Sequence, residues 1–173
     1  MQRSQSCSGL HMVLPLVISA LASHSPAQAQ CDLWQPVASG ITGTEVDALA
    51  VFGGEVIAGG LFTAAGGQPA NSIARWNGSA WQPLAGGILT APNQPGFVFA
   101  LTVFNNELIA GGAFSTAGGQ SANSVAAWNG SSWHALGSGL SSDLWALTIY
   151  NNELIAGGTF GVRRWNGETW SNI

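Results

Sequence analysis

Short apolar runs alternate with turn residues along most of this chain. Between Val98 and Leu140 the runs are ALTVF, ELIAGGAF, NSVAAW and SSWHALGSGL, and Gly, Asn and Ser separate them. None has the 3.6-residue period of an amphipathic helix, so the pattern predicts strands. Some runs, such as Ala100 to Phe104, are apolar at successive positions. This predicts strands that are covered on both faces of their sheet.

The same order of runs occurs three times, in the segments 46–88, 98–140 and 144–173. Self-similarity at this scale is typical of a repeat architecture. The third copy lacks the stretch TAGGQSANS, and an extra loop around Pro92 to Gly96 separates the first two copies. Both differences fall in turn-like sequence, where insertions and deletions are tolerated.

Two kinds of turn separate the runs within a copy. The first turn is Gly53-Gly54, Asn105-Asn106 or Asn151-Asn152, and the third is an Asn-Gly pair at 77–78, 129–130 or 166–167. Asn and Gly tolerate a positive φ and therefore suit tight hairpins. We expect each copy to form a four-stranded antiparallel meander. The fold class predicted is all-β, a β-propeller-like array of about three such blades, either open or incomplete.

The copies resemble the kelch repeat, including its galactose-oxidase-like relatives. The resemblance rests on a second strand that ends in Gly-Gly and on paired tryptophans around a turn: Trp76 with Trp81, Trp128 with Trp133, and Trp165 with Trp170. It implies a propeller blade. The oxidase activity of those relatives does not transfer, because their copper site needs more His and Tyr than His134 and Tyr150 supply.

The segment 33–41, LWQPVASGI, is similar to the fourth run of the first copy, AWQPLAGGI, and is expected to form a lone strand of that type. Three blades are fewer than the four to eight of usual propellers. Three alternatives follow: part of a larger propeller, a protomer whose ring is closed by a further copy of the chain, or an open arc with an exposed sheet edge.

The first 29 residues are predicted to be a signal peptide. Arg3 precedes an apolar run from Met12 to Ala22, and Ala27-Gln28-Ala29 provides small residues for cleavage after Ala29. The run is too short for a membrane span, which needs about 20 apolar residues. We therefore expect residues 30–173 to be secreted or periplasmic, with no stable membrane span. Cys31 then has no partner within the mature chain.

Composition removes several functional classes. Charged residues make up only 7 % of the 173 residues, and lysine is absent. Without lysine there is no Walker A loop and no Schiff-base lysine. A formal net charge of −4 argues against a nucleic-acid partner. His134, the only histidine after the leader, cannot by itself build a multi-histidine metal site, and no G-x-S-x-G elbow presents a nucleophile. No catalytic residue, metal or cofactor is predicted.

Polar or aromatic residues that differ between the copies are the better candidates for binding, because residues found in every copy serve the scaffold. Acidic candidates lie in the links that enter the first strands, and basic ones lie beside the Trp-Asn-Gly turns, where Arg163 also occurs. The candidates are Trp145, His134, Asp47, Asp143, Arg75 and Arg164. The function predicted is a non-enzymatic extracellular binding or surface-interaction module with an unassigned protein or glycan ligand. The alternatives are a carbohydrate-binding propeller that uses exposed Trp145 and a fragment of a larger extracellular enzyme.

Overall fold

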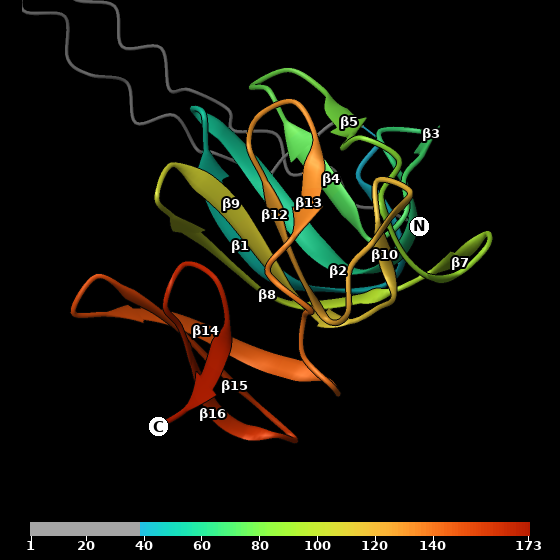
Figure 1. The fold of residues 1–173 in the computed structure, drawn as a ribbon. Coiled ribbons are helices and arrows are strands. Elements are labelled where there is room, and N and C mark those ends of the chain that lie inside the picture. The colour runs from blue at the N-terminus through green and yellow to red at the C-terminus, as the bar shows by residue number, and fades with distance from the viewer. Residues whose placement is uncertain (1–38) are drawn as a thin grey trace, which may run out of the picture. The chain divides into compact units, whose positions relative to one another are not determined.

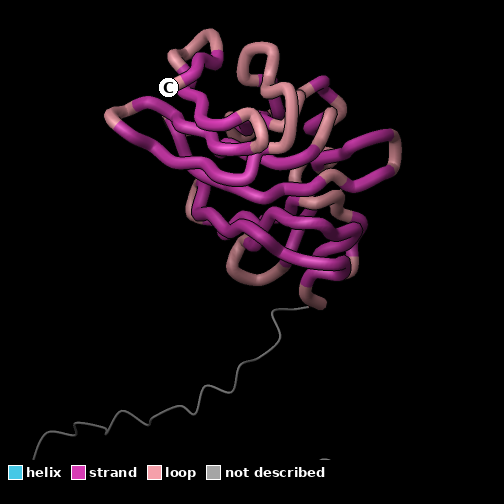
Figure 2. Tube along the Cα trace, turned by 90° about the horizontal axis from the view of Figure 1, so that it is seen from below, coloured by secondary structure: helices cyan, strands magenta, loops and turns pink. Residues whose placement is uncertain are grey.

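Strands and tight turns form the part of the chain that the computed structural model describes, residues 39–173. Among these residues there is no helix, and Figure 2 shows one strand hairpin after another. The predicted signal peptide and most of the segment 33–41 lie outside the described residues. The end of that segment, Ile41, is the first residue of a longer strand.

Three sheets share one four-stranded antiparallel meander, and we call them blades 1, 2 and 3 (Figure 1). Blade 1 contains β1 (Ile41–Phe52), β2 (Glu55–Ala65), β4 (Ile73–Trp76) and β5 (Trp81–Pro83), with the short β3 (Gln68–Pro69) paired to β2. Blade 2 contains β8 (Phe97–Phe104), β9 (Glu107–Ala113), β12 (Val125–Trp128) and β13 (Trp133–Ala135). Blade 3 contains β14 (Leu144–Tyr150), β15 (Glu153–Gly158), β16 (Gly161–Trp165) and β17 (Trp170–Asn172). The predicted all-β, propeller-like repeat array is therefore confirmed.

A fourth sheet comes from segments for which the sequence predicted only loops. It has the order β11-β10-β6-β7, with β6 (Ile88–Ala91), β7 (Gln94–Pro95), β10 (Thr116–Ala117) and β11 (Gln120–Ser121). Ile88 pairs with Ala117, just as Ile41 at the start of β1 pairs with Ala65. The extra loop at 92–96 and the TAGGQSANS stretch are thus parts of two hairpins that bond to each other.

The turns follow the sequence prediction closely. Asn105 and Asn106, which join β8 to β9, have φ values of 49° and 62°, and Asn151 and Asn152 have 48° and 60°. In each Asn-Gly turn the asparagine side chain accepts two backbone N–H groups; Asn129 Oδ1 lies 2.9 Å from the nitrogens of both Ser131 and Ser132. These bonds join residues two and three positions apart, so they hold the turn locally.

Two hydrophobic cores lie between neighbouring blades, and a third, smaller cluster that contains Phe62 and Ala74 lies within blade 1. One contains Ile57 and Ile73 from blade 1 with Val98 and Leu108 from blade 2. The other joins blades 2 and 3 through a set that includes Ile109, Val125, Leu144 and Leu154. Strand β8 contributes Leu101 and Val103 to the first core and Ala100 and Phe104 to the second. The prediction that this strand is covered on both faces is confirmed.

Two glycines allow the blades to approach this closely. A Cβ atom on Gly59 would lie 2.5 Å from Val98 Cγ1, and one on Gly111 would overlap Leu144 Cδ2. Favourable carbon contacts need about 3.5–4.0 Å. The tryptophan pairs complete the packing: the Trp128 and Trp133 rings lie 5.5 Å apart, and both are buried. The pair of blade 2 lies in the first core, and Trp165 of blade 3 lies in the second.

Candidate functional site

A hollow in the described residues lies where the third copy is shorter than the other two. In blade 2 the chain between Ala113 and Val125 makes the β10–β11 excursion. There the Ser115 amide donates to the Leu89 carbonyl at 2.9 Å. In blade 3, Gly158 pairs directly with Gly161, so no excursion exists to cover the link that follows blade 2. A cavity of about 930 Å³ remains between this link and blade 3.

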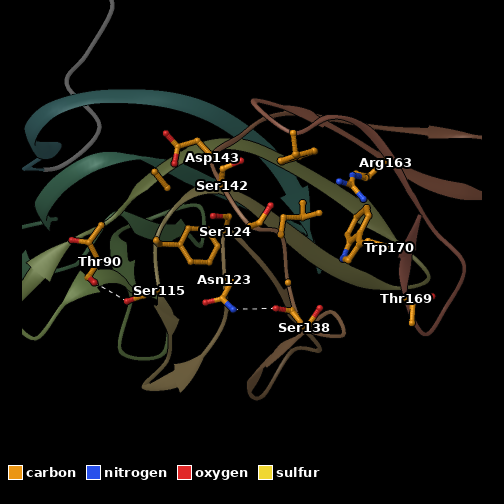
Figure 3. Close-up of a pocket in the computed structure, with 16 residues that line it drawn as sticks. Thr90, Ser115, Asn123, Ser124, Ser138, Ser142, Asp143, Arg163, Thr169 and Trp170 are labelled. Atoms are coloured by element: carbon orange, nitrogen blue, oxygen red, sulfur yellow. Dashed lines mark hydrogen bonds between the residues drawn. The ribbon is translucent and has the colours of Figure 1, made fainter. Parts of the chain in front are cut away.

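Hydroxyl and amide side chains dominate the cavity wall (Figure 3). The hydroxyl groups belong to Thr90, Ser115, Ser124, Ser138, Ser141, Ser142 and Thr169, and Asn123 adds an amide. Apolar surface comes from Ala113, Leu140 and three aromatic rings, Phe114, Phe160 and Trp170. Asp143 and Arg163 are the charged residues of the lining. The wall can donate and accept hydrogen bonds in many directions while it offers flat apolar faces.

Several of these groups are held by bonds within the wall. Ser115 Oγ donates to the Thr90 carbonyl at 2.7 Å, and Asn123 Nδ2 donates to the Ser138 carbonyl at 3.0 Å, as the dashed lines of Figure 3 mark. The Trp170 indole N–H donates to the Leu136 carbonyl at 3.1 Å, which fixes the ring against blade 2. These bonds preorganise the wall, which lowers the entropic cost of binding a ligand.

Arg163 is the residue that distinguishes this site from the equivalent place between blades 1 and 2. It pairs with Ala156 in blade 3, and the residues in the same register of the other blades, Ala74 and Ala126, are both fully buried alanines. Its Nε atom is buried and has no hydrogen-bond partner within the described residues. An unpaired buried donor costs free energy.

The structure separates the six candidates that the sequence singled out. Asp143 lines the cavity, in the link before β14. Trp145 is exposed on β14 at its bulge and does not line the cavity. Asp47 was expected in a link but lies inside β1, because β1 starts five residues before the first repeat boundary and runs on without a break.

Each of the other three candidates bonds to the glutamate that begins the second strand of its blade, Arg75 and Arg164 from the third strand and His134 from the fourth. Arg75 Nη1 lies 3.3 Å from Glu55 Oε2, and Arg164 Nη1 lies 3.6 Å from Glu153 Oε1. In blade 2 the third strand carries Ala127 at this position. There His134 on the fourth strand reaches Glu107 instead, with Nε2 2.8 Å from Oε1. The three residues are thus spread over three blades and do not form one site.

The pKa of His134 is raised above its ordinary value of 6.5. Partial burial acts in the opposite direction by disfavouring the charged ring. The hydrogen bonds to Glu107 and to the Ala135 carbonyl, together with the negative charge of Glu107, outweigh it. Protonation of His134 therefore strengthens a bond within blade 2.

Sequence reasoning missed most of the cavity lining. Trp170 was read as one of the paired tryptophans of a blade, and Asn123, Ser124 and Ser138 lay in runs predicted to be strands. Two signals pointed to the site: the missing excursion in the third copy, and an arginine in a register where the other copies have alanine. Both signals were visible in the sequence. They indicate a site only if the excursion covers the link before its blade, and the pairing of β6 with β10 is what shows this.

Comparisons with known proteins add no assignment, since neither a protein-family model nor a curated protein matches this chain. Within residues 39–173, no group of three or more His, Cys, Asp or Glu side chains is placed to hold a metal ion. A search of the same residues finds no helix with the length and apolar character that crossing a membrane requires.

Proposed function

We propose that this protein is a secreted, non-enzymatic binding module of kelch-like repeats, and that the cavity between blades 2 and 3 binds a carbohydrate. The observation that carries the proposal is the cavity wall, in which seven hydroxyl side chains and one amide surround three aromatic rings. The leader-like first 29 residues support export. The Gly-Gly strand ends and the paired tryptophans support the kelch-like assignment.

The chemistry of the wall matches a sugar better than an apolar or highly charged ligand. Each sugar hydroxyl both donates and accepts, and Ser, Thr and Asn side chains do the same. Sugar rings also have apolar C–H faces, for which Trp170 and Phe160 offer aromatic surface. A site of a few hundred to a thousand Å³ with scattered polar groups is of the size that small ligands occupy. The cavity of about 930 Å³ fits this range and leaves room for an oligosaccharide.

Arg163 supplies the strongest polar contact in this proposal. Its guanidinium donates to a ring or hydroxyl oxygen of the sugar, and Asp143 accepts from another hydroxyl. Hydrogen bonds that involve a charged group contribute about 1.5–3 kcal/mol each. Loss of one such bond weakens binding roughly tenfold or more, since 1.4 kcal/mol corresponds to a factor of ten.

The test begins with a glycan array probed with the purified full chain, followed by calorimetric titration with the glycan that binds. Arg163→Ala is the first variant, because alanine already occupies this register in blades 1 and 2. We expect it to raise Kd about tenfold or more. Arg164→Ala is the matched control: it removes the same charge from the neighbouring position, outside the cavity. We expect its Kd to stay within twofold of the wild-type value.

Three outcomes would overturn the proposal. The array shows no glycan binding, or the two arginine variants behave alike, or Trp145→Ala abolishes binding while Arg163→Ala does not. The last result would place the sugar on the exposed tryptophan of β14. Mass spectrometry of the glycan after prolonged incubation tests the non-enzymatic part, because a shortened or modified glycan would indicate an enzyme.

A further inference from the structure

Each blade has two faces, and the middle blade shows what covers them. We call the face toward the preceding blade the leading face and the face toward the following blade the trailing face. On blade 2 the leading face carries Val98 and Leu108, which lie in the core shared with blade 1. Its trailing face carries Ile109 and Val125, which lie in the core shared with blade 3. Both interfaces therefore join a trailing face to a leading face.

The leading face of blade 1 is exposed along β1 within the described residues, although Phe62 and Ala74 on the same side are buried in a cluster of blade 1 residues. Val46 of β1 is 43 % exposed, whereas Val98 and Leu144, which occupy the same register in blades 2 and 3, are fully buried. Leu49 and Val51, on the same side of β1, are 65 % and 67 % exposed. Their counterparts on β8, Leu101 and Val103, lie in the first core.

The trailing face of blade 3 is uncovered in the same way. Val162 pairs with Gly157 and is 51 % exposed, while Ile73 and Val125, its counterparts in register, are fully buried. Ile173 is 74 % exposed, but Leu136 at the same place in blade 2 is 5 % exposed. Exposed apolar residues that gather on one face mark an interaction surface.

Gly157 adds an independent sign that this face is shaped for a neighbour. Gly59 and Gly111 seat the side chains of Val98 and Leu144 from the following blade, and a Cβ at either glycine would collide with them. Gly157 occupies the same position in blade 3. A Cβ there would meet only Ala146 Cβ, at 3.9 Å. The space over Gly157 that receives a side chain in the other two blades is therefore present, and no side chain among the described residues fills it.

We propose that a second copy of this chain covers these faces: the leading face of blade 1 in one copy packs on the trailing face of blade 3 in the other, with Val46 over Gly157. The argument is continuity with two interfaces already present in the molecule, which join the same faces through the same registers. Two copies satisfy both faces of each chain and make six blades, within the usual range of four to eight. The contact uses Val46, Leu49 and Val162, none of which lines the sugar cavity, so it is independent of the proposed function.

The experiment measures the mass of the full chain by light scattering and sedimentation over a range of concentrations. Wild type should have the mass of two copies and dissociate on dilution. Leu49→Asp alters the leading face and Val162→Asp the trailing face, both at positions that are exposed in a single chain. Each should raise the dissociation constant about 100-fold or more, because a charge would be buried without a partner. Circular dichroism should be unchanged, which separates loss of association from loss of folding.

The matched control is Ser131→Glu, which adds one negative charge at an exposed turn away from both faces. The third copy already has Glu168 at this place in its Asn-Gly turn. This variant should associate as wild type does. The head-to-tail arrangement is overturned if wild type is monomeric at all concentrations, which would mean that the faces are covered by another part of the chain or by nothing. It is also overturned if only one of the two aspartate variants dissociates. That result would mean that two identical faces pack against each other, because such a contact uses one kind of face only. Assemblies of three or more copies would also overturn it, because the proposed ring contains two copies.

Discussion

Replacing Gly111 by alanine should push a methyl group into a side chain that has no room to move. The new Cβ would overlap Leu144 Cδ2 and would lie 2.9 Å from Cδ1 and 3.1 Å from Cγ. Favourable contacts between carbon atoms need about 3.5–4.0 Å. Leu144 must therefore retreat by roughly 0.5 Å or more at several atoms. It is fully buried in the core between blades 2 and 3, where close packing resists such a shift.

The expected cost follows from this geometry. Overpacking of a well-packed core typically costs about 1–3 kcal/mol, and we expect Gly111→Ala to fall in that range. Leu144→Ala alone should cost about 2–5 kcal/mol, because it leaves a cavity in the same core. In the double variant the new methyl group enters the space that the leucine leaves. The double variant should therefore lose less stability than the two single variants lose together, with a coupling free energy of about 1 kcal/mol or more.

Urea unfolding followed by tryptophan fluorescence and by circular dichroism measures all four free energies of unfolding. Coincidence of the two transitions justifies a two-state analysis, which repeat arrays do not always satisfy. Gly157→Ala, measured where the chain is monomeric, is the matched control: its new Cβ meets only Ala146 Cβ at 3.9 Å. Its stability should change by less than about 1 kcal/mol. Two results would refute the packing of Leu144 on Gly111. In one, the losses of unfolding free energy in the Gly111 and Leu144 variants are additive. In the other, Gly157→Ala loses as much as Gly111→Ala does.

Two further predictions concern single blades. Because the pKa of His134 is raised in the folded chain, its contribution to stability is fully present below the unfolded value near 6.5 and is lost as pH rises through the folded value. His134→Gln, which copies Gln82 of blade 1, should remove this dependence on pH from the free energy of unfolding in urea, measured between about pH 5 and pH 9, a range that brackets the ordinary value. An unchanged dependence would exclude the bond to Glu107 as its cause. Asn129→Ala should destabilise blade 2 by about 1 kcal/mol, because the amides of Ser131 and Ser132 lose their acceptor. Denaturant midpoints test this prediction, and a variant as stable as wild type would contradict it.

The candidate site illustrates where sequence reasoning stops. Asp143, which the sequence placed in the link before a first strand, lines the cavity. Trp145 and Trp170 could not be ranked, because both are tryptophans near strand ends and only packing places the second in the cavity wall. Arg75, His134 and Arg164 differ between copies, and that difference reflects alternative partners for one repeated glutamate. Variation between repeats therefore indicates a change of environment, which can be a bond within a blade as well as a ligand site.

The sequence by itself determined the repeat, the four strands of each blade and their turns. These depend on local physics: alternation of apolar runs with residues such as Asn105 and Asn106, which adopt a positive φ at little cost. Tertiary structure decided everything that depends on distant partners. The pairing of Ile88 with Ala117 turned two expected loops into a sheet, and its absence from the third copy opened the cavity. Val98 is buried and Val46 is exposed at the same register, because within the described residues only Val98 faces a neighbouring blade. No local pattern encodes that neighbour, because the same residues serve both environments.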